Sequence, residues 1–170
     1  MLAQLSIAEI VDHYKMLPHP EGGYYKETYR SPEQIDVDAL PARFNGNRNF
    51  STAIYFLLEK GNFSAFHRIQ SDETWHFYAG QALNIYILQE NGVLEIIQLG
   101  PEILKGQTFQ ATVPAGCWFA SAPADNSAFS FVGCTVAPGF DFMDFELAKA
   151  NELKAAFPIH AELISKLCRI

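Results

Sequence analysis

The sequence is poor in cysteine, in basic residues and in charge, and each shortage excludes a class of protein. Its three cysteines form no Cys-x-x-Cys pair, so we expect neither a disulfide framework nor a zinc ribbon, and a cytoplasmic, reducing environment fits. Lys and Arg number 12 against 19 Asp and Glu, a net charge of −7, which argues against binding to nucleic acid or to an anionic membrane. The N-terminus lacks the basic-then-apolar pattern of a secretory signal.

The shortage of charge is greatest between Gly106 and Phe140, where Asp125 is the one charged residue. Prolines and glycines interrupt this segment, so a membrane helix is excluded and about three strands with little solvent contact are predicted. Within it, residues 127–136 carry no charge on either face of the expected strand. One face should pack inside the domain and the other against a second copy in a homodimer. The alternative is that the protein's own helices cover the strand.

Helix signals stand at both ends of the chain and strand signals lie between them. Ser6 and Glu9 form a capping box ahead of an amphipathic helix over about 6–16, and about two further helices are expected over 144–169. Between them, short β-rich runs alternate with turn signals, Asn91-Gly92 being the strongest. We therefore predict one domain, 1–170, with an all-β core over about 22–136 arranged as a jelly roll, sandwich or barrel.

One spacing pattern resembles the first motif of the cupin superfamily, which is Gly, five residues, His-x-His, three or four residues, Glu, six residues and Gly. The matching positions are Gly61, His67, Glu73 and Gly80, while Ile69 replaces the second histidine. The second cupin motif, Pro-x-Gly-x-x-His, resembles residues 114–119, where Phe119 replaces the histidine.

Longer segments resemble one cupin branch, the domain of unknown function 985, which is similar in fold to dTDP-4-dehydrorhamnose epimerases and germins. The resemblance implies a double-stranded β-helix, a small-molecule ligand and a homodimer, but no particular reaction. It rests on four segments: residues 17–25, residues 66–78, residues 113–119 and residues 133–142.

The same resemblance bears on metal binding. Metal-binding cupins take two histidines and a glutamate from the first motif and a histidine from the second, and here two of those positions are the apolar Ile69 and Phe119. Two remaining ligands hold a divalent transition metal weakly, so no cofactor is predicted. If a metal is bound, His67 and Glu73 would hold it together with His76, or with His19.

Without a metal, His67 and Glu73 can still transfer protons, because a carboxylate beside an imidazole supplies a base near neutral pH. We therefore predict a metal-independent epimerase or isomerase acting on a sugar or nucleotide-sugar, with these two residues as its catalytic groups. The alternatives are a non-catalytic ligand-binding or sensing cupin, a degenerate metal-dependent cupin oxygenase, and an inert core histidine.

Further residues are candidates for ligand binding. The loop over 18–23 is stiffened by two prolines and ends in two glycines, and it presents His19 and Glu21, which we place at the barrel mouth. Six tyrosines are candidate acids, and the sequence does not choose among them: Tyr24, Tyr25, Tyr29, Tyr55, Tyr78 and Tyr86. The remaining predicted ligand-binding residues are Tyr24, Arg48, Arg68, Trp75, Phe77 and Phe119.

Overall fold

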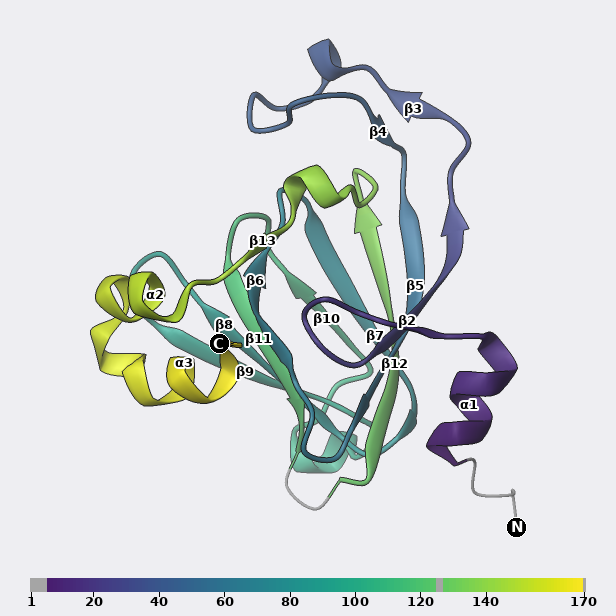
Figure 1. Ribbon diagram of the computed structural model, residues 1–170, viewed down its shortest axis with the longest axis vertical. Helices are drawn as coiled ribbons and strands as arrows, with labels where there is room; N and C mark the ends of the chain where they lie inside the picture. The colour runs from purple at the N-terminus through teal and green to yellow at the C-terminus, as the bar shows by residue number, and fades with distance from the viewer. Residues whose placement is uncertain (1–5, 125–126, 170) are drawn as a thin grey trace.

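Two antiparallel sheets form the body of the protein in the computed structural model, which describes residues 6–124 and 127–169. The outermost residues of the predicted domain, 1–5 and 170, and Asp125 lie outside this range. The larger sheet has the strand order β1-β2-β5-β12-β7-β10 and the smaller one the order β13-β6-β11-β8-β9 (Figure 1). A two-stranded ribbon, β3-β4, extends from one end. This is the predicted double-stranded β-helix, with an all-β core.

The strands reach beyond the predicted limits of the core on both sides. They are β1 (Leu17–Pro18), β2 (Tyr24–Arg30), β3 (Gln34–Ile35), β4 (Arg48–Asn49), β5 (Thr52–Glu59), β6 (Ser64–Arg68), β7 (Asp72–Gly80), β8 (Leu83–Leu88), β9 (Leu94–Leu99), β10 (Gln110–Val113), β11 (Trp118–Pro123), β12 (Phe129–Ala137) and β13 (Glu146–Leu147).

The main hydrophobic core lies between the two sheets. Phe56 and Trp75 from the larger sheet meet Ile85, Ile87 and Phe119 from the smaller one, and all five are almost fully buried. Strand alternation sends these side chains inward and their neighbours outward. The core fills the barrel from one end, and a cavity remains at the other.

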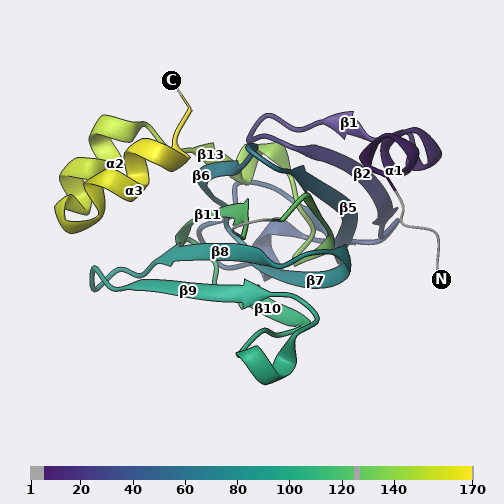
Figure 2. The ribbon, with the colours of Figure 1, turned by 90° about the horizontal axis from the view of Figure 1, so that it is seen from below.

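The helices pack on the outside of the two sheets at opposite sides of the molecule, α1 beside β2 and α2 and α3 near β6 and β13 (Figure 2). Helix α1 (Ile7–Tyr14) begins with the predicted Ser6–Glu9 capping box, and its Ile10 packs with Leu57 and Phe131 of the larger sheet. Helices α2 (Ala150–Ala156) and α3 (Ala161–Leu167) pack against the smaller sheet, with Ile164 among the residues of that cluster. Short 3-10 turns complete the chain: η1 (Val37–Ala39), η2 (Ile103–Lys105), η3 (Phe142–Asp144) and η4 (Pro158–His160).

The helical region predicted from residue 144 starts later than expected. Residues 142–144 form the turn η3, residues 146–147 pair as β13 with Arg68 and His67 of β6, and helix α2 begins at Ala150. The exposed edge of β6 offers unpaired backbone groups, and pairing with them overrides the local helix preference.

The charge-poor strand over 127–136 is buried within the protein itself. It becomes β12, which pairs with β5 on one side and β7 on the other. Its outward Phe131 is covered by α1, where it stacks on Tyr14, and Tyr78 lies over Gly133. The protein's own helix α1 therefore covers part of this strand's outer face, and the homodimer remains a prediction.

In the part of the chain that the structure describes, no helix combines the length and the apolar character that crossing a membrane requires.

Candidate functional site

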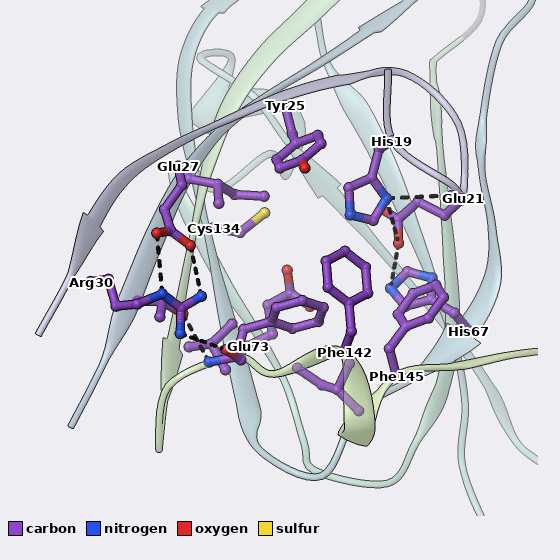
Figure 3. A pocket seen from close by; sticks show the side chains of 15 residues that line it. His19, Glu21, Tyr25, Glu27, Arg30, His67, Glu73, Cys134, Phe142 and Phe145 are labelled. Atoms are coloured by element: carbon purple, nitrogen blue, oxygen red, sulfur yellow. Dashed lines mark hydrogen bonds and ion pairs between the residues drawn. The ribbon is translucent and has the colours of Figure 1, made fainter. Parts of the chain in front are cut away.

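A cavity of about 300 Å³ opens at one end of the barrel. Strands β5 and β7 begin at this end, while β2, β6 and β12 finish there, so residues from distant parts of the sequence converge on it. Figure 3 shows the side chains around it. The lining residues are His19, Glu21, Tyr25, Glu27, Arg30, Thr52, Ile54, His67, Ile69, Glu73, Cys134, Val136, Phe140, Phe142 and Phe145.

The loop between β1 and β2 brings His19 and Glu21 into the cavity. Gly22 and Gly23 adopt φ angles of 120° and 73°, and a Cβ at Gly23 would lie 2.6 Å from the carbonyl oxygen of Leu57, so a side chain there would meet the strand beneath. The backbone of Glu21 is fixed from two sides, because its carbonyl oxygen accepts hydrogen bonds from the Ala65 N–H and from Nε of Arg169. The glutamate is therefore held at a defined position.

His67 pairs with Glu21. Its Nε2 lies 3.0 Å from Oε2 of Glu21, and its Nδ1 lies 2.7 Å from the carbonyl oxygen of Ala65. A carbonyl oxygen only accepts, so Nδ1 carries a hydrogen, and the short Nε2–Oε2 contact requires one more proton between its two atoms. That proton rests either on Glu21 or on His67. The sequence predicted Glu73 as the carboxylate beside His67. Glu73 does line the same cavity and influences the pKa of His67, but the carboxylate in direct contact with Nε2 is that of Glu21.

Burial shifts the ionisation of all three groups on this side of the cavity. The pKa of Glu21 is raised, mainly because burial disfavours its charged form. The pKa values of His67 and His19 are lowered for the same reason, against an opposing effect of nearby carboxylates. His67 lies between two phenyl rings, with centroids 4.1 Å away for Phe119 and 5.3 Å away for Phe145, which explains its poor solvation. The groups therefore favour their uncharged forms.

Glu73 is the second acid of the cavity. It stands near the start of β7 and is 8% exposed, and burial raises its pKa to about 7, against the opposing effect of His67. The neighbouring thiol of Cys134, which lines the same cavity, also opposes the rise in the pKa of Glu73. The pKa of that thiol is itself raised well above its ordinary value, first by burial and then by Glu73, so Cys134 remains a thiol. Glu73 is thus positioned to gain or lose a proton near neutral pH.

A bulge in β2 places an ion pair on the opposite side of the cavity from His19, Glu21 and His67 (Figure 3). Glu27 pairs with Ile54 and Tyr29 with Ala53, so Thr28 is the extra residue and Arg30 follows Glu27 onto the inner face. Both carboxylate oxygens of Glu27 accept hydrogen bonds from the Arg30 guanidinium, at 3.1 and 2.7 Å.

Aromatic side chains from the segment after β12 close the cavity. Phe140, Phe142 and Phe145 pack edge to face with one another, and Phe142 also lies parallel to the ring of His19, with centroids 6.3 Å apart. The rings of Tyr25 and His19 meet edge to face, with their centroids 4.8 Å apart. Tyr25 is the one tyrosine among the described residues that line the cavity, so it is the tyrosine placed to act as an acid. The walls are therefore mostly apolar, with polar groups at two separate places.

The two arginines predicted to bind the ligand do not line the cavity. Arg48 forms a two-bond contact with Asp144, at 2.7 and 2.6 Å, and joins the base of the β3-β4 ribbon to η3. Arg68 points away from the barrel, lies over Trp118 and pairs with Glu146. Their predicted role is corrected for one reason: each guanidinium is already paired with a carboxylate outside the cavity.

Four predicted aromatic residues also lie elsewhere. Trp75 and Phe77 follow Glu73 along β7 and pack with the main core, and Phe119 reaches His67 from behind and is not part of the cavity wall. Tyr24 packs with the α1 cluster on the outer face of the larger sheet. Trp75, Phe77 and Phe119 therefore belong to the packed core between the sheets, and Tyr24 belongs to the outer face, so none of the four lines the cavity.

The donor set does not fit the usual metal of the cupin fold. Ile69 lines the cavity at one ligand position, Phe119 occupies another, and His76 lies on the outer face of β7, where it hydrogen-bonds to Thr135 and Gln110. Among residues 6–124 and 127–169, no three His, Cys, Asp or Glu side chains are grouped so as to hold a metal ion. Metal binding by His67, Glu73 and His76 together is therefore wrong on geometric grounds.

Sequence reasoning missed the part played by Glu27, Arg30 and the phenylalanines. The bulge at Thr28 leaves no clear signal, since simple alternation would put Arg30 on the face opposite Glu27. Phe140 and Phe142 had a signal, because they belong to one of the four segments that resemble the cupin branch.

Comparison with known proteins places this chain in a family and matches its fold to solved structures. The family model described as "Cupin superfamily (DUF985)" matches residues 8–148. The chain is 30% identical to the uncharacterised protein YML079W of Saccharomyces cerevisiae over 159 residues, covering 88% of this chain and 79% of that protein. The crystal structure of SO0799 from Shewanella oneidensis superposes with a TM-score of 0.87 at 39% identity, covering 98% of this chain and 99% of that one.

A more distant match shows the fold alone. Oxalate decarboxylase from Bacillus subtilis is similar with a TM-score of 0.53 at 18% identity, covering 88% of this chain and 36% of that one.

Proposed function

This chain belongs to the cupin superfamily, in the family described as DUF985. From that premise we propose that it binds a small molecule and moves protons to and from that molecule without a metal. The reaction is epimerisation or isomerisation at a carbon next to a carbonyl, on a sugar or a similar carbonyl compound. The observation that carries the proposal is the 3.0 Å contact between Nε2 of His67 and Oε2 of Glu21, in a buried cavity that also contains Glu73.

Two acid–base groups in the cavity, Glu73 and the Glu21–His67 pair, support this chemistry. Glu73 has a pKa of about 7, so that near neutral pH a fraction of it is ionised and can take a proton from carbon. The Glu21–His67 pair holds one proton that can be returned to the same carbon. The carbon–hydrogen bond breaks, its electron pair moves into an enol or enolate, and reprotonation on the other face gives the epimer. Tyr25, and His19 through its ring nitrogen, are the neighbouring donors that can hydrogen-bond the carbonyl oxygen.

Exchange of solvent deuterium tests the proposal. The protein is incubated in deuterium oxide with a panel of aldoses, ketoses and cyclic ketones, and label at the carbon next to the carbonyl is followed by NMR and mass spectrometry. Protein-dependent labelling of at least one compound is expected. Compounds that bind in the cavity without acquiring label would contradict catalysis and leave the non-catalytic binding cupin.

Glu73 should also make stability depend on pH. Its pKa of about 7 in the folded protein exceeds the ordinary carboxyl value of 4.5, so the folded state binds more protons between these two values. Stability from this group is therefore fully present below about pH 4.5 and is lost as pH rises through 7. A pKa difference of one between the folded and unfolded states corresponds to about 1.4 kcal/mol.

The comparison of Glu73→Gln with the wild type measures this dependence. Urea unfolding at several pH values should show Glu73→Gln gaining stability over the wild type as pH rises from 5 to 8, because the amide carries no proton to lose. An identical dependence in both proteins would contradict the buried, protonated Glu73. Glu90→Gln, at the exposed β8–β9 turn, is the control.

A further inference from the structure

The size of the cavity limits what it can take. At about 300 Å³ it lies at the lower end of the range of ligand pockets, roughly 300–1,000 Å³. Aromatic rings of Phe140, Phe142 and Phe145 stand around it and pack against one another. A single ring with a few substituents suits this space, whereas a nucleotide joined to a sugar needs far more.

Among the described residues that line the cavity, no lysine or arginine is left without a partner that an anion would have to displace. Arg30 is the one lysine or arginine among the lining residues. Its Nε and Nη2 donate to the two carboxylate oxygens of Glu27, and its Nη1 donates to Oδ1 of Asn49 at 2.9 Å and to the carbonyl oxygen of Phe140 at 3.0 Å. The charge of the guanidinium is therefore neutralised, and its donors are directed at protein acceptors.

The two buried carboxyl groups of the cavity work against an anion as well. Glu21 and Glu73 are both buried carboxyl groups that face the cavity, and an anionic ligand would meet any negative charge that either carries. An anion would also lose its water against walls formed by Ile54, Ile69 and Val136. Burying a charge without a partner is costly, whereas a carbonyl or hydroxyl group needs one or two hydrogen bonds, which Tyr25 and His19 can supply.

We infer that the cavity binds a compact ligand that has no negative charge and that carries a carbonyl or hydroxyl group on an apolar body. The inference rests on the proposed function for the identity of the site, and it narrows the substrate from the sugar or nucleotide-sugar class to uncharged single-ring compounds. Phosphorylated sugars, nucleotide-sugars and carboxylates are excluded as ligands, because each would bury a negative charge without a positive partner.

Two pairs of probes, equal in shape and different in charge, test the inference. They are benzamide with benzoate, and D-glucose with D-glucuronate, titrated into ¹⁵N-labelled protein at pH 7.5 and followed by amide chemical shifts. We expect at least one uncharged probe to shift the amide signals of cavity residues such as Glu21 and His67, with its anionic partner binding at least tenfold more weakly. Glu27→Gln removes the carboxylate that neutralises Arg30 and should strengthen benzoate or glucuronate binding several-fold, while the Glu90→Gln control should not.

The outcomes separate this inference from the proposed function. Anions that bind in the cavity as tightly as their uncharged partners would overturn the inference, and so would the absence of cavity shifts with all four probes at 20 mM. Deuterium exchange seen only with anionic carbonyl compounds would overturn the inference and leave the proposed function standing. Selective binding of uncharged probes with no exchange on any compound would do the reverse.

Discussion

Replacing His67 by alanine should slow deuterium exchange on a compound that the wild type labels by about 10²- to 10⁴-fold, the usual contribution of a positioned acid–base group. The replacement removes Nε2, which shares a proton with Oε2 of Glu21 at 3.0 Å, and leaves that buried carboxyl without its imidazole. It also opens space beside Phe119 and Phe145, whose rings contact His67. Some loss of stability, on the order of 1–3 kcal/mol, is therefore expected as well.

His76→Ala is the matched control for this experiment. His76 comes from the same segment of sequence but lies on the outer face of β7, with its ring nitrogens hydrogen-bonded to Thr135 and Gln110. The His76→Ala variant should leave the exchange rate within about twofold of the wild type, because the His76 side chain hydrogen-bonds to Thr135 and Gln110, which lie outside the cavity. Rates should be compared under conditions where urea unfolding shows each variant to be folded. A folded His67→Ala protein that keeps the wild-type rate would contradict the assignment of His67.

Replacing Asp144 by alanine should lower the free energy of unfolding by about 3 kcal/mol or more, because removing one partner of a buried ion pair leaves the other charge buried alone. The side chain of Arg48 is 1% exposed, and Asp144 accepts hydrogen bonds from its Nε and Nη2. Asp144 ends η3, which begins at Phe142, and it directly precedes Phe145; both phenylalanines line the cavity. The variant should therefore also loosen this wall and weaken binding of whichever uncharged probe the wild type takes.

The pair Arg68–Glu146 provides a control with contacts of nearly equal length. Its Nη2–Oε2 distance is 2.7 Å, but the two side chains are 39% and 53% exposed. Glu146→Ala should cost under about 1 kcal/mol, as is usual for ion pairs in water. Urea unfolding of both variants provides the comparison. In the double variant Arg48→Met, Asp144→Leu, much of the lost stability should return, because no unpaired charge stays buried. Equal losses for Asp144→Ala and Glu146→Ala would contradict the structural role of the Arg48 pair.

The sequence by itself indicated the barrel and named four residues that line its cavity, His19, Glu21, His67 and Glu73. The spacing of Gly61, His67, Glu73 and Gly80 was sufficient to predict one strand, a turn and a second strand with His67 and Glu73 facing inward, and both residues line the cavity. Local signals were equally reliable for α1, where the Ser6 capping box depends on residues three apart. Patterns of this kind depend on residues that are close in sequence, so they predict local structure without knowledge of long-range contacts.

Only the tertiary structure decided the partners of those residues. Glu21 reaches His67 from a loop that precedes β2, and Arg48 finds Asp144 across 96 positions of sequence, so no local pattern announces either contact. The bulge at Thr28 turns Arg30 inward, and edge pairing with β6 converts residues 146–147 from predicted helix to strand. In each case the free energy comes from a long-range contact that outweighs the local preference, which is why the sequence indicated the proton-transfer site but not the arrangement of its charges.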